Sequence, residues 1–296
     1  MKYTFICVLF NVIVAAFLLL IGTLPFAVLG AETARNFLFS TWPLGLALLS
    51  LVIMINIFFA LNFRLYRLLE RMDWPALAAH LEDRMRKRGK PSTRLTLTLI
   101  HTYLALSAFD SLRALMERIA GEKPALLEEH ALLFGAARLL AGDYAPAERF
   151  FAEQSARRAG TRRKRPRVET GWLSWYRALA LFMERRYGEA ADIFCDFSSP
   201  AGGAPRISRA ERSPWAMITG LSSWFLGHFL APALREKQAE LSAAAETGRA
   251  LTRRALPTRS AWEKNAARYG DDAHVLILSQ YVTEAAAWLY VSEGEL

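Results

Sequence analysis

The sequence predicts an all-α protein, in which a two-span transmembrane helical hairpin precedes an α-solenoid of stacked helix pairs. Three observations lead to this fold class. Two long uncharged apolar segments come first, in residues 3–31 and 36–63. Aromatic residues then recur at intervals of 35, 35 and 43 residues. Between them, apolar residues keep helical spacing, and a period near 34 is typical of stacked helical repeats.

The two apolar segments are long enough to cross a bilayer. No charged residue occurs from Tyr3 to Ala31 or from Asn36 to Phe63. Each segment exceeds the roughly 20 residues that a helix needs to span the hydrocarbon core. We therefore expect a hairpin anchor in residues 1–63, with spans at about 3–23 and 43–63.

The predicted hairpin contains residues that interrupt helices and two asparagines within the apolar segments. Gly22 and Pro25 are expected to end the first helix, and segment 37–43 to form an interfacial return. Asn11 and Asn56 lie at similar depths when counted from the cytoplasmic ends. A hydrogen bond between them would fix the register and contribute about 0.6–2 kcal/mol. The alternative is two separate polar residues that face lipid or other proteins.

The flanking charges orient the hairpin. Eight Lys and Arg residues lie between Arg64 and Lys90, whereas the segment between the spans holds only Arg35. This bias places the chain after the hairpin in the cytoplasm. The predicted location is the bacterial inner (cytoplasmic) membrane, as a multi-pass protein. Cleavage of the first span as a signal peptide is a less favoured alternative.

An aromatic residue followed by small or apolar residues at plus three and plus seven repeats along the chain. Its copies are Trp74 with Leu77 and Leu81, Phe109 with Leu112 and Met116, Tyr144 with Ala147 and Phe151, and Tyr187 with Ala190 and Phe194. A small residue stands nine positions before the aromatic in two copies, as Gly135 and Ala178. A fifth copy is expected at Gly220 and Phe229. One helix pair cannot bury its apolar face alone, so stacked pairs are expected.

These residues resemble the tetratricopeptide repeat, although Leu65 and Ile100 stand where that family has a small residue. The resemblance covers residues 64–234, and residues 235–296 are expected to form C-terminal helices that include a capping helix. The layout is similar to that of bacterial membrane-anchored tetratricopeptide proteins of the HemY type. The resemblance implies a scaffold whose groove binds a peptide or helix of a protein partner. The alternative is an unrelated helical bundle.

One segment between the predicted repeats is strongly basic. Its seven cations are Arg157, Arg158, Arg162, Arg163, Lys164, Arg165 and Arg167. They could dock on anionic lipid or an acidic protein, or form a solvated loop. No aromatic residue interleaves them, which disfavours nucleic acid. The alternative functions are therefore a lipid-docking regulatory module or a non-catalytic subunit of a membrane complex.

No catalytic motif is present, so the sequence predicts neither an enzyme nor a cofactor. Cys7 and Cys195 have no disulfide or metal-type spacing. Asp271, Asp272 and His274 could bind a metal, but an acidic N-terminal helix cap explains them better. We therefore expect no metal site.

The aromatic residues Trp172, Trp175 and Tyr176 fall on more than one face of a predicted helix. Packing between repeats is the usual fate of such side chains. We expect two of them in the core and one on the surface of the groove, where it could anchor a partner.

Overall fold

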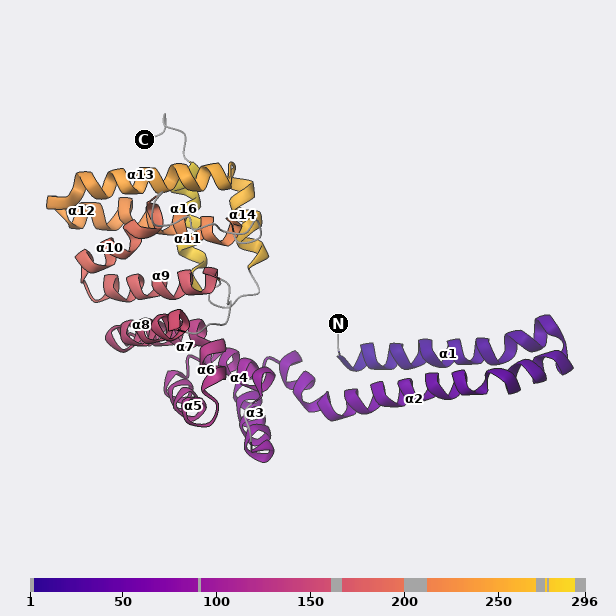
Figure 1. Cartoon of the computed structure of the whole chain (residues 1–296). Helices are drawn as coiled ribbons and strands as arrows, with labels where there is room; N and C mark the ends of the chain where they lie inside the picture. The colour runs from indigo at the N-terminus through magenta and orange to yellow at the C-terminus, as the bar shows by residue number, and fades with distance from the viewer. Residues whose placement is uncertain are drawn as a thin grey trace. The chain divides into compact units, whose positions relative to one another are not determined.

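Helices form all of the regular structure that the computed structural model describes, in residues 3–89, 92–160, 167–199, 212–269, 275 and 277–290 (Figure 1). The predicted all-α class is confirmed. The chain divides into two compact units, Met1–Gly89 and Lys90–Leu296. The unit that contains the N-terminal hairpin thus extends well beyond residue 63.

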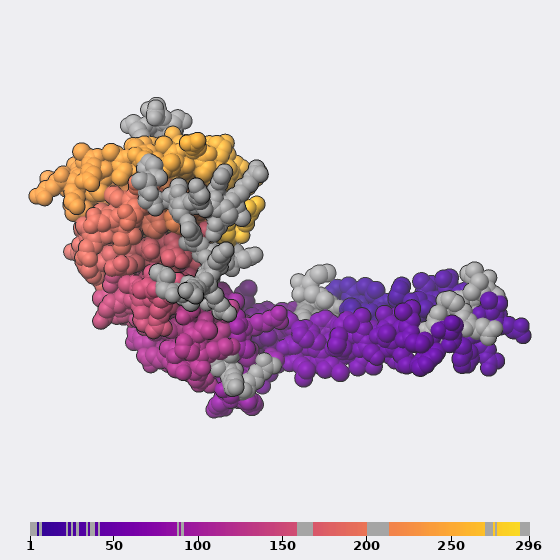
Figure 2. Space-filling view, viewed as in Figure 1, coloured from indigo at the N-terminus to yellow at the C-terminus, as the bar shows by residue number. Residues whose placement is uncertain are grey.

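The first unit contains three helices, α1 (Tyr3–Leu29), α2 (Ala31–Glu70) and α3 (Trp74–Arg88). Helices α1 and α2 lie side by side along their length (Figure 2). Helix α2 continues without a break from the second apolar segment into the first predicted repeat, as its apolar periodicity indicates.

The hairpin turns at a different place from the one predicted. Helix α1 passes through Gly22 and Pro25, and the return is at Gly30, whose φ is 78°. Residues 37–43, the expected return, lie inside α2. An apolar segment satisfies its backbone polar groups best by remaining helical, so the chain turns at the glycine that adopts a positive φ without steric cost.

The hairpin presents its apolar side chains outward. Val8, Leu44 and Leu61 are 57%, 75% and 73% exposed. Among the described residues, one stretch, Trp42–Glu70, is long and apolar enough to cross a membrane, and Val8–Ile21 is a shorter apolar stretch. These two stretches lie on α2 and α1 respectively.

Polar and aromatic contacts fix the register of α1 against α2. The Asn11 side-chain amide donates to Oδ1 of Asn56 at 3.0 Å, which is the hydrogen bond that the sequence suggested. Asn56 also donates to the carbonyl of Val52. Phe10 and Phe59 meet edge to face, with their ring centroids 6.0 Å apart.

The second unit is a succession of antiparallel helices stacked in layers (Figure 1). Its main helices are α4 (Thr93–Ala105), α5 (Phe109–Glu122), α6 (Pro124–Glu129), α7 (Ala131–Leu140), α8 (Tyr144–Gly160), α9 (Arg167–Met183), α10 (Tyr187–Ser198), α11 (Arg212–Phe225), α12 (Ala231–Ala233), α13 (Gln238–Ala255), α14 (Arg259–Arg268) and α16 (Ser279–Tyr290). Its core is rich in large aromatic side chains, among them Trp175, Trp224 and Trp262.

The C-terminal helix α16 closes part of this stack by packing on α11 and α14. Its residues Val282, Ala285 and Leu289 are buried. The indole N–H of Trp262 donates to the carbonyl of Val282 at 3.1 Å. Residues at its start also line a cleft with α7 and α9, so this helix runs across several layers of the stack and is not a cap at its end.

The expected fifth turn at Phe229 is wrong. Phe229 lies inside a π-helical segment, Leu226–Leu230, through which α11 continues into α12. The next helix, α13, begins only at Gln238. The side chains around Phe229 explain this continuation, since its ring packs against Trp224 and Phe225 of the same helix. The glycine paired with this turn, Gly220, instead faces Trp262 of α14.

Candidate functional site

Four turns in the chain share one backbone geometry. In each, a residue with positive φ lies two residues after the end of the first helix. The second helix starts two residues further on, at Trp74, Phe109, Tyr144 or Tyr187. The positive-φ residues are Met72 (52°), Ser107 (52°), Gly142 (82°) and Arg185 (63°).

The hydrogen bonds of these turns are also the same. The N–H of Gly142 donates to the carbonyl of Leu139, and that of Asp143 donates to Arg138. This pair of bonds defines a Schellman motif. Both bonds recur at the other three turns, with N···O distances of 2.9–3.2 Å across the set. Only Gly142 could have been recognised from the sequence as a residue suited to a positive φ.

The predicted positions at plus three and plus seven are buried in all four copies. They are Leu77, Leu81, Leu112, Met116, Ala147, Phe151, Ala190 and Phe194. Gly135 of α7 allows a close approach of the next helix, because a Cβ atom there would lie 2.2 Å from Cζ of Phe151. Ala178 of α9 is likewise fully buried. The small residues thus lie where two helices of a pair come together.

An apolar cleft of about 160 Å³ opens between α7, α9 and the start of the C-terminal helical segment. Its walls come from positions that are far apart in sequence. They include Leu139, Leu140, Tyr176, Leu179, Met183, Ile277, Leu278, Gln280 and Tyr281. Leu140 and Met183 are 50% and 39% exposed, so an apolar rim faces solvent. Sequence analysis did not find this cleft.

Other aromatic rings pack against the two tyrosines that line the cleft. Tyr281 packs against Trp224 and Phe225, with centroid distances of 5.9 and 5.4 Å. The ring of Tyr176 stacks on Phe151 at 5.4 Å. Burial raises the pKa of both tyrosines, so their hydroxyl groups stay neutral at physiological pH.

Trp172, Trp175 and Tyr176 are all buried, with at most 5% exposure. The expectation that one of them would lie on the surface is wrong. A cluster of rings holds them, since Trp175 also contacts Phe194 and Phe225 edge to face. Tyr176 nevertheless lines the apolar cleft from the core side.

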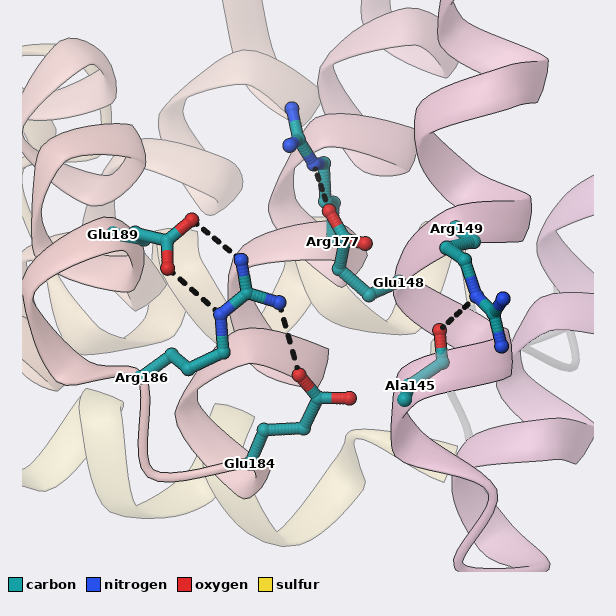
Figure 3. A network of polar contacts seen from close by, with 7 residues as sticks. All are labelled: Ala145, Glu148, Arg149, Arg177, Glu184, Arg186 and Glu189. Carbon is teal, nitrogen blue, oxygen red and sulfur yellow. Dashed lines mark hydrogen bonds and ion pairs between the residues drawn. The ribbon is translucent and has the colours of Figure 1, made fainter.

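Ion pairs surround the turn between α9 and α10 (Figure 3). The guanidinium of Arg186 donates to Glu189 at 2.6 and 2.7 Å and to Glu184 at 3.1 Å. These hydrogen bonds raise the pKa of Arg186 and lower that of Glu189. Arg177 pairs with Glu148 of the preceding helix at 2.7 Å. Such pairs fix the turn and join neighbouring helices.

The basic segment is only partly described. Arg162, Arg163, Lys164 and Arg165 lie outside the described residues, and Arg167 begins α9. Arg157 is exposed and pairs with Glu153 at 2.6 Å.

Arg158 does not suit a surface-docking role. Its side chain is 5% exposed and donates to Glu169 at 3.0 Å and to the carbonyl of Glu128 at 2.7 Å. The prediction that Arg158 docks on an anionic surface is therefore wrong. Its long side chain instead joins α8 to α9 and to the end of α6, where burial makes the hydrogen bonds more valuable than solvent contact.

Within the described residues, no group of three or more His, Cys, Asp and Glu side chains could hold a metal ion. The segment 270–274, which contains Asp271, Asp272 and His274, is outside them. Burial raises the pKa of the Cys195 thiol to about 11, so this side chain is protonated at neutral pH.

The comparisons with known proteins cover most of the second unit. The family model described as "Uncharacterised Treponema protein" matches residues 111–291, which is more than half of the chain. The chain belongs to this family. An uncharacterized protein of Treponema pallidum (strain Nichols) is 28% identical over 251 residues, which cover 83% of this chain and 74% of the relative. No solved structure matches.

The family match begins within α5 and ends just after α16. It therefore includes all the residues that line the apolar cleft, which lie on α7, on α9 and between residues 277 and 281. It does not include the N-terminal hairpin.

Proposed function

We propose that this chain is a membrane-anchored scaffold whose tetratricopeptide-like helix pairs bind a protein partner. The observation that carries the proposal is the recurrence of one Schellman turn at Met72, Ser107, Gly142 and Arg185. Helix pairs joined by the same turn and packed through the same positions are how repeat arrays present an extended binding surface.

The apolar cleft supplies the place where a partner would bind. Its volume, about 160 Å³, is below the roughly 300–1,000 Å³ of small-molecule sites. It suits one or two apolar side chains from an amphipathic helix or an extended peptide, which anchor such complexes. The rim formed by Leu140 and Met183 would be covered on binding.

The α1–α2 hairpin is the proposed anchor. Its outward apolar side chains and the lack of ionisable residues within the two apolar segments support a two-span arrangement in the inner membrane. The Asn11–Asn56 hydrogen bond supports it as well, because it would satisfy polar groups of both helices within lipid. The second unit would then lie on the cytoplasmic side.

Photo-crosslinking in living cells tests the binding surface. A benzoylphenylalanine residue replaces Leu140 or Met183 at the rim, and in control strains it replaces the half-exposed Arg118 or the exposed Glu263. We expect discrete adducts of one protein from the two rim positions and none from the controls. Equal adducts at all four positions, or no adduct at the rim, would contradict the proposed binding surface.

Cysteine accessibility tests the anchor. In a protein whose Cys7 and Cys195 are replaced by serine, one cysteine at Glu32, next to the hairpin turn, or at Arg259, in the second unit, is labelled from either side of the inner membrane. We expect the Glu32 position to react only from outside the cytoplasm, and the Arg259 position only from inside. Labelling of both from the same side would exclude the two-span arrangement.

A further inference from the structure

The C-terminal part of α3 returns beside Asn62 of α2 in the first unit. The two helices pack in an antiparallel arrangement after the turn at Met72. Both terminal nitrogens of the Arg84 guanidinium lie 3.3 Å from Oδ1 of Asn62 and donate to it. Asn62 is one residue before the end of the uncharged segment that closes at Phe63. Arg84 is thereby held beside the last turn of the uncharged segment of α2.

Helix geometry carries the next residues further in the same direction. From Trp74 to Arg84, α3 runs back about 15 Å, which brings it level with Asn62. The helix continues to Arg88, about 6 Å beyond Arg84. If α2 crosses the bilayer, Arg86 and Lys87 lie at the depth of the lipid headgroups.

The charges at this place are predominantly positive. The side chains of Arg86 and Lys87 are 81% and 74% exposed. Both pair with one carboxylate, that of Asp83, at 3.0 and 2.6 Å. A single carboxylate cannot neutralise two cations, and Arg84 adds a third charge nearby.

The pKa of His80 reflects the same positive charges. Burial is the main cause that lowers its pKa, and Arg64 and Arg84 lower it further. Lys87 acts in the same direction, whereas Asp83 opposes it. Arg64 of α2 and Arg84 and Lys87 of α3 are therefore all close enough to His80 to act on it.

We propose that Arg64, Arg84, Arg86 and Lys87 form a basic surface that binds anionic phospholipid headgroups. This inference rests on the membrane anchor of the proposed function. An arginine fork and a lysine ammonium match the acceptor oxygens of a lipid phosphate, and basic residues beside a span attract anionic lipid. The bound headgroup would hold the C-terminal turn of α3 on the bilayer surface, so that the first helix pair is fixed relative to the membrane. The site differs from the basic segment 157–167 that the sequence pointed to.

Native mass spectrometry of the full-length protein in detergent tests the site, with phosphatidylglycerol or phosphatidylcholine added. The test variant is R86Q/K87Q, which keeps the Arg84–Asn62 contact. The control is R118Q/R259Q, which also removes two cations, one half-exposed and one exposed, that are each paired with a glutamate four residues later. We expect the affinity for phosphatidylglycerol to fall about fivefold per cation, or about 25-fold, in the test variant and to change little in the control.

Three results would overturn the proposal. They are an equal loss in test and control variants, equal retention of phosphatidylcholine and phosphatidylglycerol, and displacement of the lipid by a millimolar excess of inorganic phosphate. Adding R84Q is expected to weaken phosphatidylglycerol binding by a further factor of about five.

Alkaline carbonate extraction of membranes separates this inference from the anchor itself. If the wild-type protein remains in the membrane while lipid retention is unchanged in R86Q/K87Q, the headgroup site alone is wrong. If carbonate releases the wild-type protein, the membrane anchor and the headgroup site are both wrong.

Discussion

The ring of Phe151 occupies the space that a side chain on Gly135 would need. A Cβ atom added to Gly135 would lie 2.2 Å from Cζ and 2.3 Å from Cε1 of that ring. The ring cannot move away easily, because Tyr176 stacks on it at 5.4 Å and Phe151 is fully buried. The pair explains why a small residue stands nine positions before the aromatic of this turn.

Gly135→Ala is therefore expected to destabilise the protein. Alanine gains about 1 kcal/mol in helix propensity, but overpacking of a buried ring costs about 1–3 kcal/mol and more where neighbours cannot move. We expect the melting temperature to fall by several degrees. Gly121→Ala is the control, since nothing lies within 4 Å of an added Cβ in α5, and it should raise stability slightly. A Gly135→Ala protein that is as stable as Gly121→Ala would show that the close approach is not present in solution.

The positive φ of these turns predicts that two substitutions have opposite effects on stability. Gly142 has a φ of 82° and Ser107 a φ of 52° in the same Schellman motif. A residue other than glycine costs about 1–2 kcal/mol in this conformation. Gly142→Ala should therefore destabilise the protein by about 1 kcal/mol, and Ser107→Gly should leave it as stable or more so. Thermal unfolding followed by circular dichroism measures both, and the same sign for both changes would argue against a shared turn.

Histidines of the second unit predict a dependence of stability on pH. Burial lowers the pKa of His101 and His130, and His101 lowers that of His130 further, while Glu129 raises it. Above a pH of about 6.5 both the folded and the unfolded forms are neutral, so the free energy of unfolding is at its full value. As the pH falls below this value, the unfolded chain takes up protons that the folded chain does not, and stability is lost.

The melting temperature should thus decrease as the pH is lowered from about 7 to about 5.5. His130→Gln should flatten this dependence, because it removes the more buried of the two imidazoles. His228→Gln, in which an exposed histidine is changed, serves as the control. A dependence equally steep in the wild type and in His130→Gln would assign the effect to other groups.

The Asn11–Asn56 hydrogen bond predicts coupling between two positions of the hairpin. Asn11→Leu and Asn56→Leu should each make the hairpin unfold at a lower SDS concentration. Circular dichroism measures this unfolding. The double variant should lose less than the sum of the single losses, by about 0.6–2 kcal/mol. Strict additivity would mean that the two amides do not pair in the membrane-mimetic environment.

Local sequence patterns could predict much of this fold. The starts of α3, α5, α8 and α10 coincide with the four aromatic residues that the spacing singled out. The burial of the plus-three and plus-seven positions follows as well. These features depend on residues within about two helical turns of each other, and the helical period therefore fixes them.

Other features depended on contacts between distant segments. Arg158 is buried because Glu169 and the carbonyl of Glu128 lie where its side chain ends. The chain continues as a helix through Phe229, whose ring packs against Phe182 of α9. Neither outcome has a local signal in the sequence.

The sequence by itself determined the helical class, the four turns and the pairing depth of Asn11 and Asn56, since each is encoded by spacing along one or two helices. Only the tertiary structure decided that residues 277–281 complete an apolar cleft with α7 and α9, and that Arg84 returns to Asn62. A side chain's partners across the fold depend on how whole helices pack, and spacing within one helix does not encode that.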